Sequence, residues 1–223
     1  STAAAALEDI KVSGQTKVWY ETNNAGAAVT ATDSTDLFDK TGSTGEVTFK
    51  VDMTGKQGNV GFGASVVQTG TMGLAGNLVS STRSGAAVVD NDMFVNEMYI
   101  TAPLGAKTLL KFGKQELQTP LAFTEKWASV NNTFDAAVAI NNSIDNLTLI
   151  AAFVGQGNGP TTALALNHTG TYAGNTGGTY AVAALFKNDM LAANVWYYDL
   201  ESAAKAFWID ASGKIGPATV KGI

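Results

Sequence analysis

The chain has 223 residues, of which only 15% are charged, and its formal net charge is −5. It has no cysteine and a single histidine, His168, which excludes a disulfide framework, a thiolate metal site and a catalytic array of several histidines. The acidic balance argues against nucleic acid as a partner, because phosphate binding needs a concentrated basic surface.

Apolar residues recur along the chain with a period of two, which is the pattern of a β-strand with one apolar face. The pattern is present over residues 10–21 and again over 46–53, and a short turn at 54–58 leads into 60–66, which predicts a hairpin. Further strands are predicted over 93–101, 107–115, 133–141, 147–154, 179–186, 190–198, 206–211 and, less regularly, 218–223. The sequence therefore predicts ten or eleven strands in a single domain over residues 1–223.

The connections between these segments alternate in length. Long connections at 22–45, 68–92, 116–132 and 155–178 alternate with short ones at 54–58, 102–106, 142–146 and 187–189. Most of the strands have eight to twelve residues, whereas strands in soluble sandwiches average about five to six. A transmembrane barrel explains both features, because strands of about 9 to 11 residues cross the apolar slab, with tight turns at one end and long loops at the other. The predicted fold is all-β, a transmembrane antiparallel β-barrel; the alternative is a one-sided antiparallel sheet in water.

The direction of each side chain follows from this fold, because a water-filled barrel turns its apolar row to lipid and its charged row to the lumen. The strand residues predicted to line the lumen are Lys11, Lys17, Glu21, Glu46, Lys50, Asp52, Glu97, Lys111 and Asp135. Aromatic residues at strand ends are expected to form an interfacial girdle, and these are Tyr20, Tyr99, Phe112, Trp196, Tyr197, Tyr198 and Trp208. In the soluble alternative, the same rings would close the ends of a core.

The last residues, 218–223, have the pattern of the middle of a strand. An eleventh strand would break the even count usual in bacterial barrels. We therefore expect the N-terminal part of a longer barrel, and the alternative is a closed ten-stranded barrel that ends near residue 211.

The segment 96–121 carries a family resemblance. A strand that contains Tyr99 and Ile100 is followed by a tight turn and by a strand that closes with Phe112-Gly113-Lys114-Gln115. Together with the start at 7–14, this segment resembles Gram-negative outer-membrane porins, and most closely the campylobacterial major outer-membrane porin family. The resemblance covers about 40 residues as a near-motif and most of the chain as a pattern.

The resemblance implies a barrel of about 16 to 18 strands in the bacterial outer membrane, usually a homotrimer, that passes ions and small hydrophilic solutes by diffusion. In such porins the third long loop folds into the lumen and narrows it. Here that loop is 116–132, whose charged residues Glu116, Glu125 and Lys126 become candidates for the constriction; the alternative is that they are merely solvated.

The expected function is a diffusion channel, and no array of catalytic residues is recognisable. A secreted or surface all-β binding module, similar to an adhesin, is the alternative function. No cofactor is expected, although acid clusters at Asp33, Asp36 and Asp39 and at Asp90 and Asp92 offer oxygen ligands for Ca²⁺. Four Asn-X-Ser/Thr sequences, which begin at Asn131, Asn141, Asn146 and Asn167, are interpreted as turn chemistry.

Overall fold

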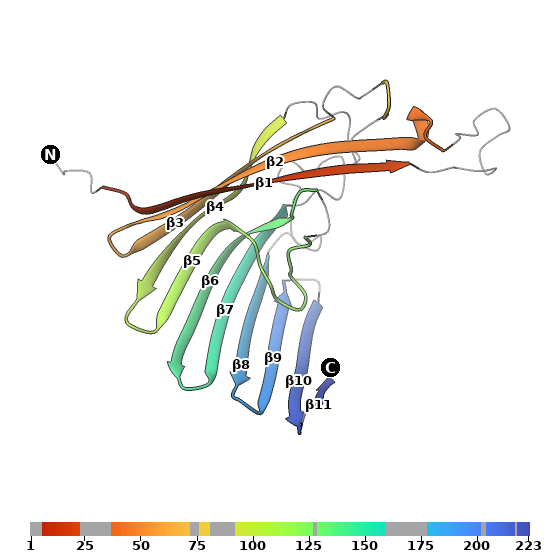
Figure 1. Cartoon of the computed structure of the whole chain (residues 1–223). Helices are drawn as coiled ribbons and strands as arrows, with labels where there is room; N and C mark the ends of the chain where they lie inside the picture. The colour runs from red at the N-terminus through yellow and green to blue at the C-terminus, as the bar shows by residue number, and fades with distance from the viewer. Residues whose placement is uncertain are drawn as a thin grey trace.

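The computed structural model describes residues 6–22, 37–71, 76–80, 92–126, 129–158, 178–201, 204–216 and 218–223. They form one antiparallel sheet of eleven strands whose spatial order is their order in the sequence (Figure 1). The strands are β1 (Glu8–Thr22), β2 (Ser43–Gln57), β3 (Val60–Gly70), β4 (Asp92–Leu104), β5 (Thr108–Gln115), β6 (Thr133–Ile144), β7 (Leu147–Asn158), β8 (Thr179–Lys187), β9 (Leu191–Leu200), β10 (Ala204–Ile215) and β11 (Ala218–Gly222). A single turn of 3-10 helix, η1 (Lys40–Gly42), precedes β2.

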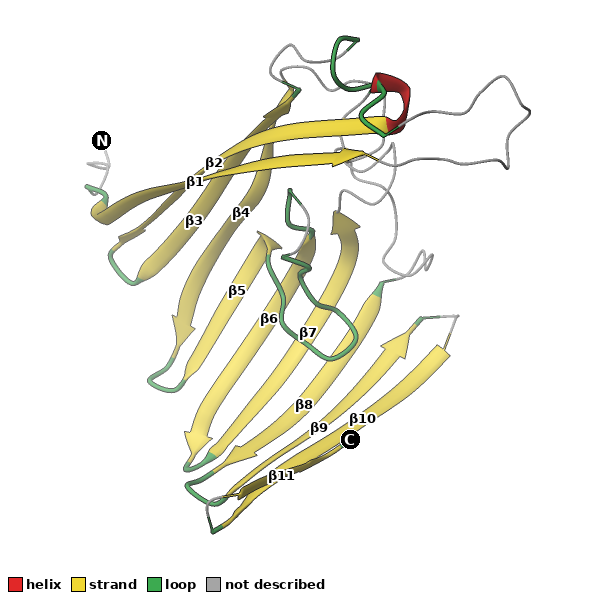
Figure 2. Cartoon of the chain, turned by 45° about the vertical axis from the view of Figure 1, so that its right-hand side comes forward, coloured by secondary structure: helices red, strands yellow, loops and turns green. Residues whose placement is uncertain are grey.

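The predicted strands and most of the predicted connections are confirmed. Short turns join β2 to β3, β4 to β5, β6 to β7 and β8 to β9 at one end of the sheet (Figure 2), and the longer connections begin from strand ends at the other end. The exception is the connection from β9 to β10, which takes only residues 201–203 although it lies at the end with the long segments. The alternation of loop lengths therefore holds for the first eight connections and fails at the ninth.

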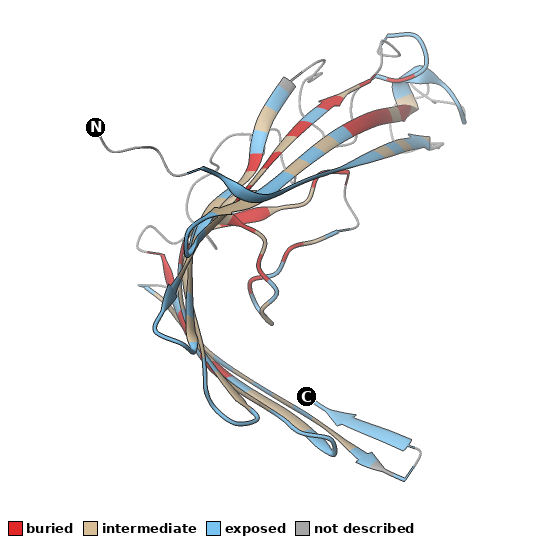
Figure 3. Ribbon diagram, turned by 60° about the vertical axis from the view of Figure 1, so that its left-hand side comes forward, coloured by how far each residue is buried: buried red, intermediate tan, exposed pale blue. Residues whose placement is uncertain are grey.

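The two faces of the sheet follow the pairing register of β1 to β4. Val51 pairs with Gly14 and Val66, while its neighbour Lys50 pairs with Gln15 and Val67 in the opposite row. Val51 is 53% exposed, whereas the Lys50 side chain is 17% exposed. The sheet is strongly curved, and the described residues of the loop between β5 and β6, 116–126 and 129–132, lie on its concave side (Figure 3). Since Lys50 lies within ion-pair distance of Glu116 in this loop, the charged row faces the concave side and the apolar row the convex side.

The convex face leaves much apolar surface uncovered. The accessible surface of the chain is 13344 Å² for a mass of 23.1 kDa, against about 9,700 Å² expected for a compact monomer of that mass. Large exposed side chains such as Phe49, Val51, Met98, Val182 and Phe207 lie in the convex row. A soluble protein rarely exposes such a continuous apolar surface, which matches a face that contacts acyl chains.

Within the described residues, no helix has the length and hydropathy needed to cross a membrane.

Only three of the seven aromatic residues predicted to form an interfacial girdle lie on the convex face. Tyr20, Phe112 and Tyr197 lie on the convex face. The remaining four point to the concave side, where they contact the loop or the wall beneath it: Tyr99, Trp196, Tyr198 and Trp208. For these four the prediction of a girdle is wrong, because position near a strand end does not determine the row in which a residue lies.

The sheet is open along both margins in the described strands, where β1 pairs with β2 and β11 pairs with β10. Strand β10 extends to Ile215, beyond the point at which a ten-stranded barrel was to end, and β11 continues the sheet. The alternative of a closed ten-stranded barrel is therefore wrong.

The assignment of the two faces predicts that a lysine introduced in the convex row destabilises the protein, whereas one introduced in the concave row does not. Val51→Lys places a charge on the convex row near the middle of β2, and we expect it to lower the free energy of unfolding from lipid vesicles by about 2 to 4 kcal/mol. Ser13→Lys is the control, because Ser13 lies in the concave row opposite Asp52. Urea unfolding of both variants checks this; an equal loss for both would contradict the assignment.

Candidate functional site

The segment between β5 and β6 is a structured loop. Residues 117–124 form a small hairpin with a bridge between Gln118 and Phe123, and the Thr124 amide donates to the Leu117 carbonyl at 2.8 Å. The Thr119 hydroxyl closes the tip, because it donates to the Ala122 carbonyl at 2.8 Å and accepts from the Ala122 amide at 3.0 Å. The loop therefore satisfies its own backbone over the sheet.

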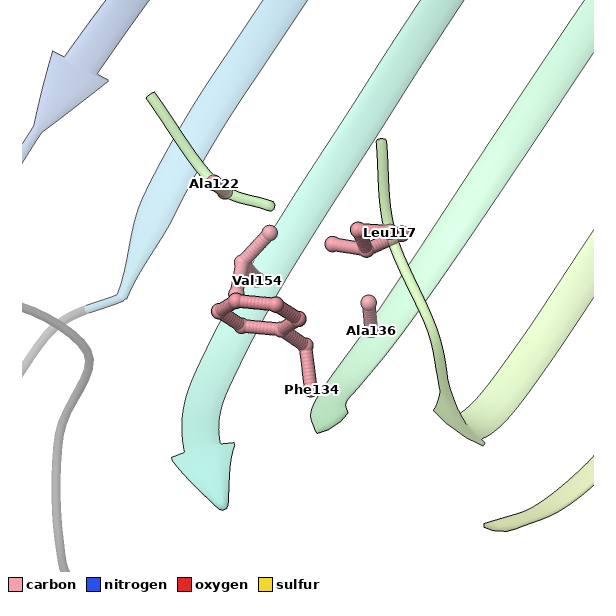
Figure 4. Close-up of a cluster of buried hydrophobic side chains, with 5 residues drawn as sticks. All are labelled: Leu117, Ala122, Phe134, Ala136 and Val154. Atoms are coloured by element: carbon pink, nitrogen blue, oxygen red, sulfur yellow. The ribbon is translucent and has the colours of Figure 1, made fainter. Parts of the chain in front are cut away.

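Apolar side chains fix this hairpin to the concave wall (Figure 4). Leu117 and Ala122 of the loop pack against Phe134 and Ala136 of β6 and Val154 of β7. All five are less than 9% exposed. Burial of these side chains favours the docked loop, because each removes apolar surface from water.

A charged cluster fixes the start of the loop. The ammonium of Lys50 lies 2.9 Å from Asp52, 3.4 Å from Glu97 and 3.9 Å from Glu116. The Glu116 amide also donates to the Glu97 carboxylate at 3.2 Å. One lysine of β2 thus joins two wall carboxylates to a carboxylate of the loop, and its charge is shared among three acids.

The end of the loop is held by polar bonds to β1 and β2. The Asn131 amide donates to Glu116 at 2.8 Å, and the Lys17 ammonium donates to the Asn131 side-chain oxygen at 3.3 Å. The Ser129 hydroxyl donates to the Glu46 carboxylate at 2.7 Å. Both ends of the loop are therefore tied to the charged part of the concave wall.

Glu116 is the central group of this arrangement. Partial burial acts to raise the pKa of its carboxyl, but the hydrogen bonds from Asn131 and Lys126 and the charges of Lys126 and Lys50 outweigh burial and hold the pKa below its ordinary value. Lys126 lies 3.0 Å from Glu116. The ionised carboxylate therefore stabilises the docked loop, and protonation weakens it.

The structure brings together six of the predicted lumen residues: Lys17, Lys50, Asp52, Glu97, Glu116 and Lys126. Lys111 lies beside them with its ammonium 3.7 Å from the centre of the Tyr99 ring. Gly63 lies opposite Tyr99, and a β-carbon there would overlap the ring, so glycine allows the ring to lie against β3. Lys11 is on the same row at the open margin of β1, and the Glu125 amide bonds to Asn132 in the loop.

Asp135 departs from the predicted facing. Its neighbours Phe134 and Ala136 point to the loop, so Asp135 lies in the convex row, where it pairs with Lys114 at 3.1 Å and accepts a hydrogen bond from Asn158. The prediction that Asp135 faces the lumen is wrong, because the concave row of β6 is formed by even-numbered residues.

The concave wall of β6 to β10 is largely apolar, which the sequence pattern does not predict. Asn194 and Asp210 are exceptions in the same row, and they are hydrogen-bonded to each other at 2.8 Å. Trp196 stacks on Tyr198 with ring centres 5.8 Å apart, and both pack among Ala181, Ala183 and Trp208. The concave side therefore has a charged part on β1 to β5 and an aromatic part on β8 to β10, with the loop between them.

Two further interpretations from the sequence can be compared with the structure. Asn131 is a bridge between Lys17 and Glu116, so its interpretation as turn chemistry is wrong. Of the possible Ca²⁺ ligands, Asp33, Asp36, Asp90 and the side chain of Asp92 lie outside the described residues, and Asp39 accepts hydrogen bonds from Thr41. Within the described ranges there is no cluster of three metal-ligating side chains.

Comparison with known proteins gives matches in structure alone. No family model matches the sequence, and no curated protein matches it. OccK8 (OprE) of Pseudomonas aeruginosa has a TM-score of 0.69 and 17% identity, over 98% of this chain and 53% of its own. The BenF-like porin of Pseudomonas fluorescens Pf-5 has a TM-score of 0.68 and 17% identity, over 96% of this chain and 56% of its own. OccAB1 of Acinetobacter baumannii has a TM-score of 0.67 and 17% identity, over 99% of this chain and 52% of its own.

These neighbours are Gram-negative outer-membrane porins, and the likeness shows that the chain has the fold of part of such a β-barrel. The chain spans about half the length of these structures.

The lowered pKa of Glu116 predicts that the docked loop loosens in acid. Ionisation of Glu116 stabilises the docked state above the ordinary pKa of 4.5, and this contribution is lost as the pH falls through the lower pKa of the folded state. A spin label at Leu121→Cys, unique because the chain has no cysteine, should become more mobile below about pH 4.5.

Two variants test the source of this mobility. In a Glu116→Gln background the label should be mobile at pH 7 and lose most of its pH dependence, because glutamine does not titrate. A label at Asn146→Cys, in the turn from β6 to β7, is the control and should not respond to pH. Loosening that persists unchanged in Glu116→Gln would show that another group controls the loop.

Proposed function

We propose that this chain forms part of an outer-membrane porin, a water-filled channel for passive diffusion of ions and small hydrophilic solutes. The observation that carries the proposal is the loop 116–132, which is tied to the charged concave wall through Glu116, Asn131 and Ser129. A loop fixed inside a curved sheet whose convex face is apolar is the arrangement that narrows a lumen while leaving it open to water.

The charges on the concave side suggest how the channel selects solutes. A pore replaces the cost of carrying an ion through hydrocarbon by passage through water, and charged rings then tune which sign passes. Lys17, Lys50 and Lys111 lie on the wall, with Glu97 and Asp52 beside them and Glu116 on the loop. Charges of mixed sign on two sides of the narrowing would produce a transverse field, and the net charge of −5 favours weak cation preference.

The open margins of the described sheet support a proposal about the complete barrel. The margins of β1 and β11 each carry a row of backbone groups on the side away from their one neighbour, and lipid contains no partner for such groups. We propose that further strands complete a barrel of about 16 to 18 strands, as in an even-numbered bacterial porin. The homotrimer and the kinship with the campylobacterial major outer-membrane porins remain proposals on the resemblance of 96–121.

The other functions considered have less support. A secreted or surface binding module would place the convex apolar row in water, where side chains such as Phe49 and Val51 are each 53% exposed. The structural neighbours are porins, which are channels and not enzymes. We propose that the channel works without a cofactor. Binding of Ca²⁺ by the acid clusters of the long loops remains a separate proposal.

Conductance of the purified full-length protein in planar bilayers tests the proposal. Glu116→Gln combined with Glu125→Gln removes two negative charges from the loop. The reversal potential in a salt gradient should therefore shift toward the equilibrium potential of the anion. The shift should be clear at 0.1 M salt, where the Debye length is about 10 Å, and small at 1 M, where it is about 3 Å.

Asp145→Asn combined with Asp189→Asn is the matched control, because these two acids lie in the short turns from β6 to β7 and from β8 to β9. An unchanged conductance and reversal potential in the loop variant would show that the loop is not the constriction. Absence of channels in the unmodified protein would reject the function itself.

A further inference from the structure

A cavity lies between the inserted loop and the concave wall, and it borders the charged cluster at Glu116. Its volume is about 330 Å³, and it is lined by Leu117 and Ala122 from the loop and by Val138, Ala152, Ala181 and Trp196 from β6 to β9. The loop hairpin covers it, because Leu117 and Ala122 are themselves packed against the wall (Figure 4). The cavity is therefore an apolar compartment beside the lumen.

The walls of the cavity contain a buried hydroxyl group that has no partner within the described part of the chain. Thr179 is 1% exposed, and its hydroxyl forms no hydrogen bond with the described residues around it. A buried polar group without a partner costs free energy, which a bound molecule with one hydrogen-bonding group would recover. The Tyr198 hydroxyl, which lines the same cavity, lies beside Thr119 and the Leu121 backbone, so the loop meets the wall there.

The charged residues at the cavity leave no net charge for a ligand to balance. Lys111 and Glu116 both line it, and they have opposite signs. Lys111 faces the Tyr99 ring, while Glu116 is paired with Lys126 and hydrogen-bonded by Asn131. A charged ligand would lose its hydration, and its attraction to one of these two groups would be offset by repulsion from the other, so the cavity favours a neutral molecule.

We propose that this cavity binds an uncharged aromatic compound of one or two rings that carries one hydrogen-bonding group. An apolar cavity of about 150 Å³ holds benzene, and ligand pockets begin at about 300 Å³, so the volume suits a ring system of this size. The ring would pack on Trp196, which is already stacked on Tyr198, and its polar group would bond to Thr179. Bound there, the compound contacts both loop and wall and stabilises the docked loop. This inference rests on the fold and does not require that the protein conducts.

Binding of indole to the full-length protein in detergent tests the inference, with saturation-transfer NMR as the readout. Ala181→Trp fills the cavity, and we expect it to abolish saturable binding. Thr179→Val keeps the shape of the side chain but removes the hydroxyl, and it should weaken binding about fivefold, as expected for one hydrogen bond. Ala139→Trp is the matched control, because Ala139 lies in the convex row of β6, and it should bind indole like the unmodified protein.

The outcomes separate this inference from the channel function. Saturable binding that is lost in Ala181→Trp and weakened in Thr179→Val supports the site, whether or not the same preparation conducts. Equal signals from the unmodified protein and Ala181→Trp would overturn it, since indole would then only enter the detergent. Tighter binding of the anion indole-3-carboxylate than of indole would also overturn it, because the site would then recognise charge.

Discussion

The alternation of side chains along each strand is the constraint on which the rest of this structure depends. Successive residues point to opposite faces of a sheet, so the pairing of Val51 with Val66 also fixes Lys50 beside Val67 on the other face. Backbone groups are satisfied between neighbouring strands, which leaves the side chains alone to meet lipid or water. An apolar convex row and a polar concave row then follow over β1 to β5.

The inserted loop depends on this arrangement from both ends. Lys50 and Lys17 can hold Glu116 and Asn131 only because both lysines lie in the concave row. Their charges are partly shielded from bulk water, so the network is worth more than an exposed ion pair of the same length. The apolar contacts of Leu117 and Ala122 add a second attachment, which does not depend on ionisation and is not screened by salt. The loop is thus fixed by an ionic network, which acid and salt weaken, and by apolar contacts, which they do not weaken.

The two parts of the concave wall suit different chemical groups. The charged part around Lys50 and Glu97 attracts water and ions, whereas the aromatic part around Trp196 and Tyr198 favours apolar surface. The loop separates the two, so one segment of chain both narrows the proposed lumen and closes the apolar cavity. A change at Glu116 therefore acts on the first, and a change at Ala181 on the second.

The sequence alone predicted ten or eleven strands and the two rows of β1 to β5, because a period of two with charges on one side puts all of those charges on one face of the sheet. It also located the loop and its charges at Glu116 and Lys126. Only the tertiary structure placed Asp135 on the convex face and Trp196 on the concave face, because strands such as β6 to β9 are apolar on both sides and period alone does not distinguish their rows. The role of Asn131 was likewise decided by contacts with residues distant in sequence, such as Lys17, which local pattern does not encode.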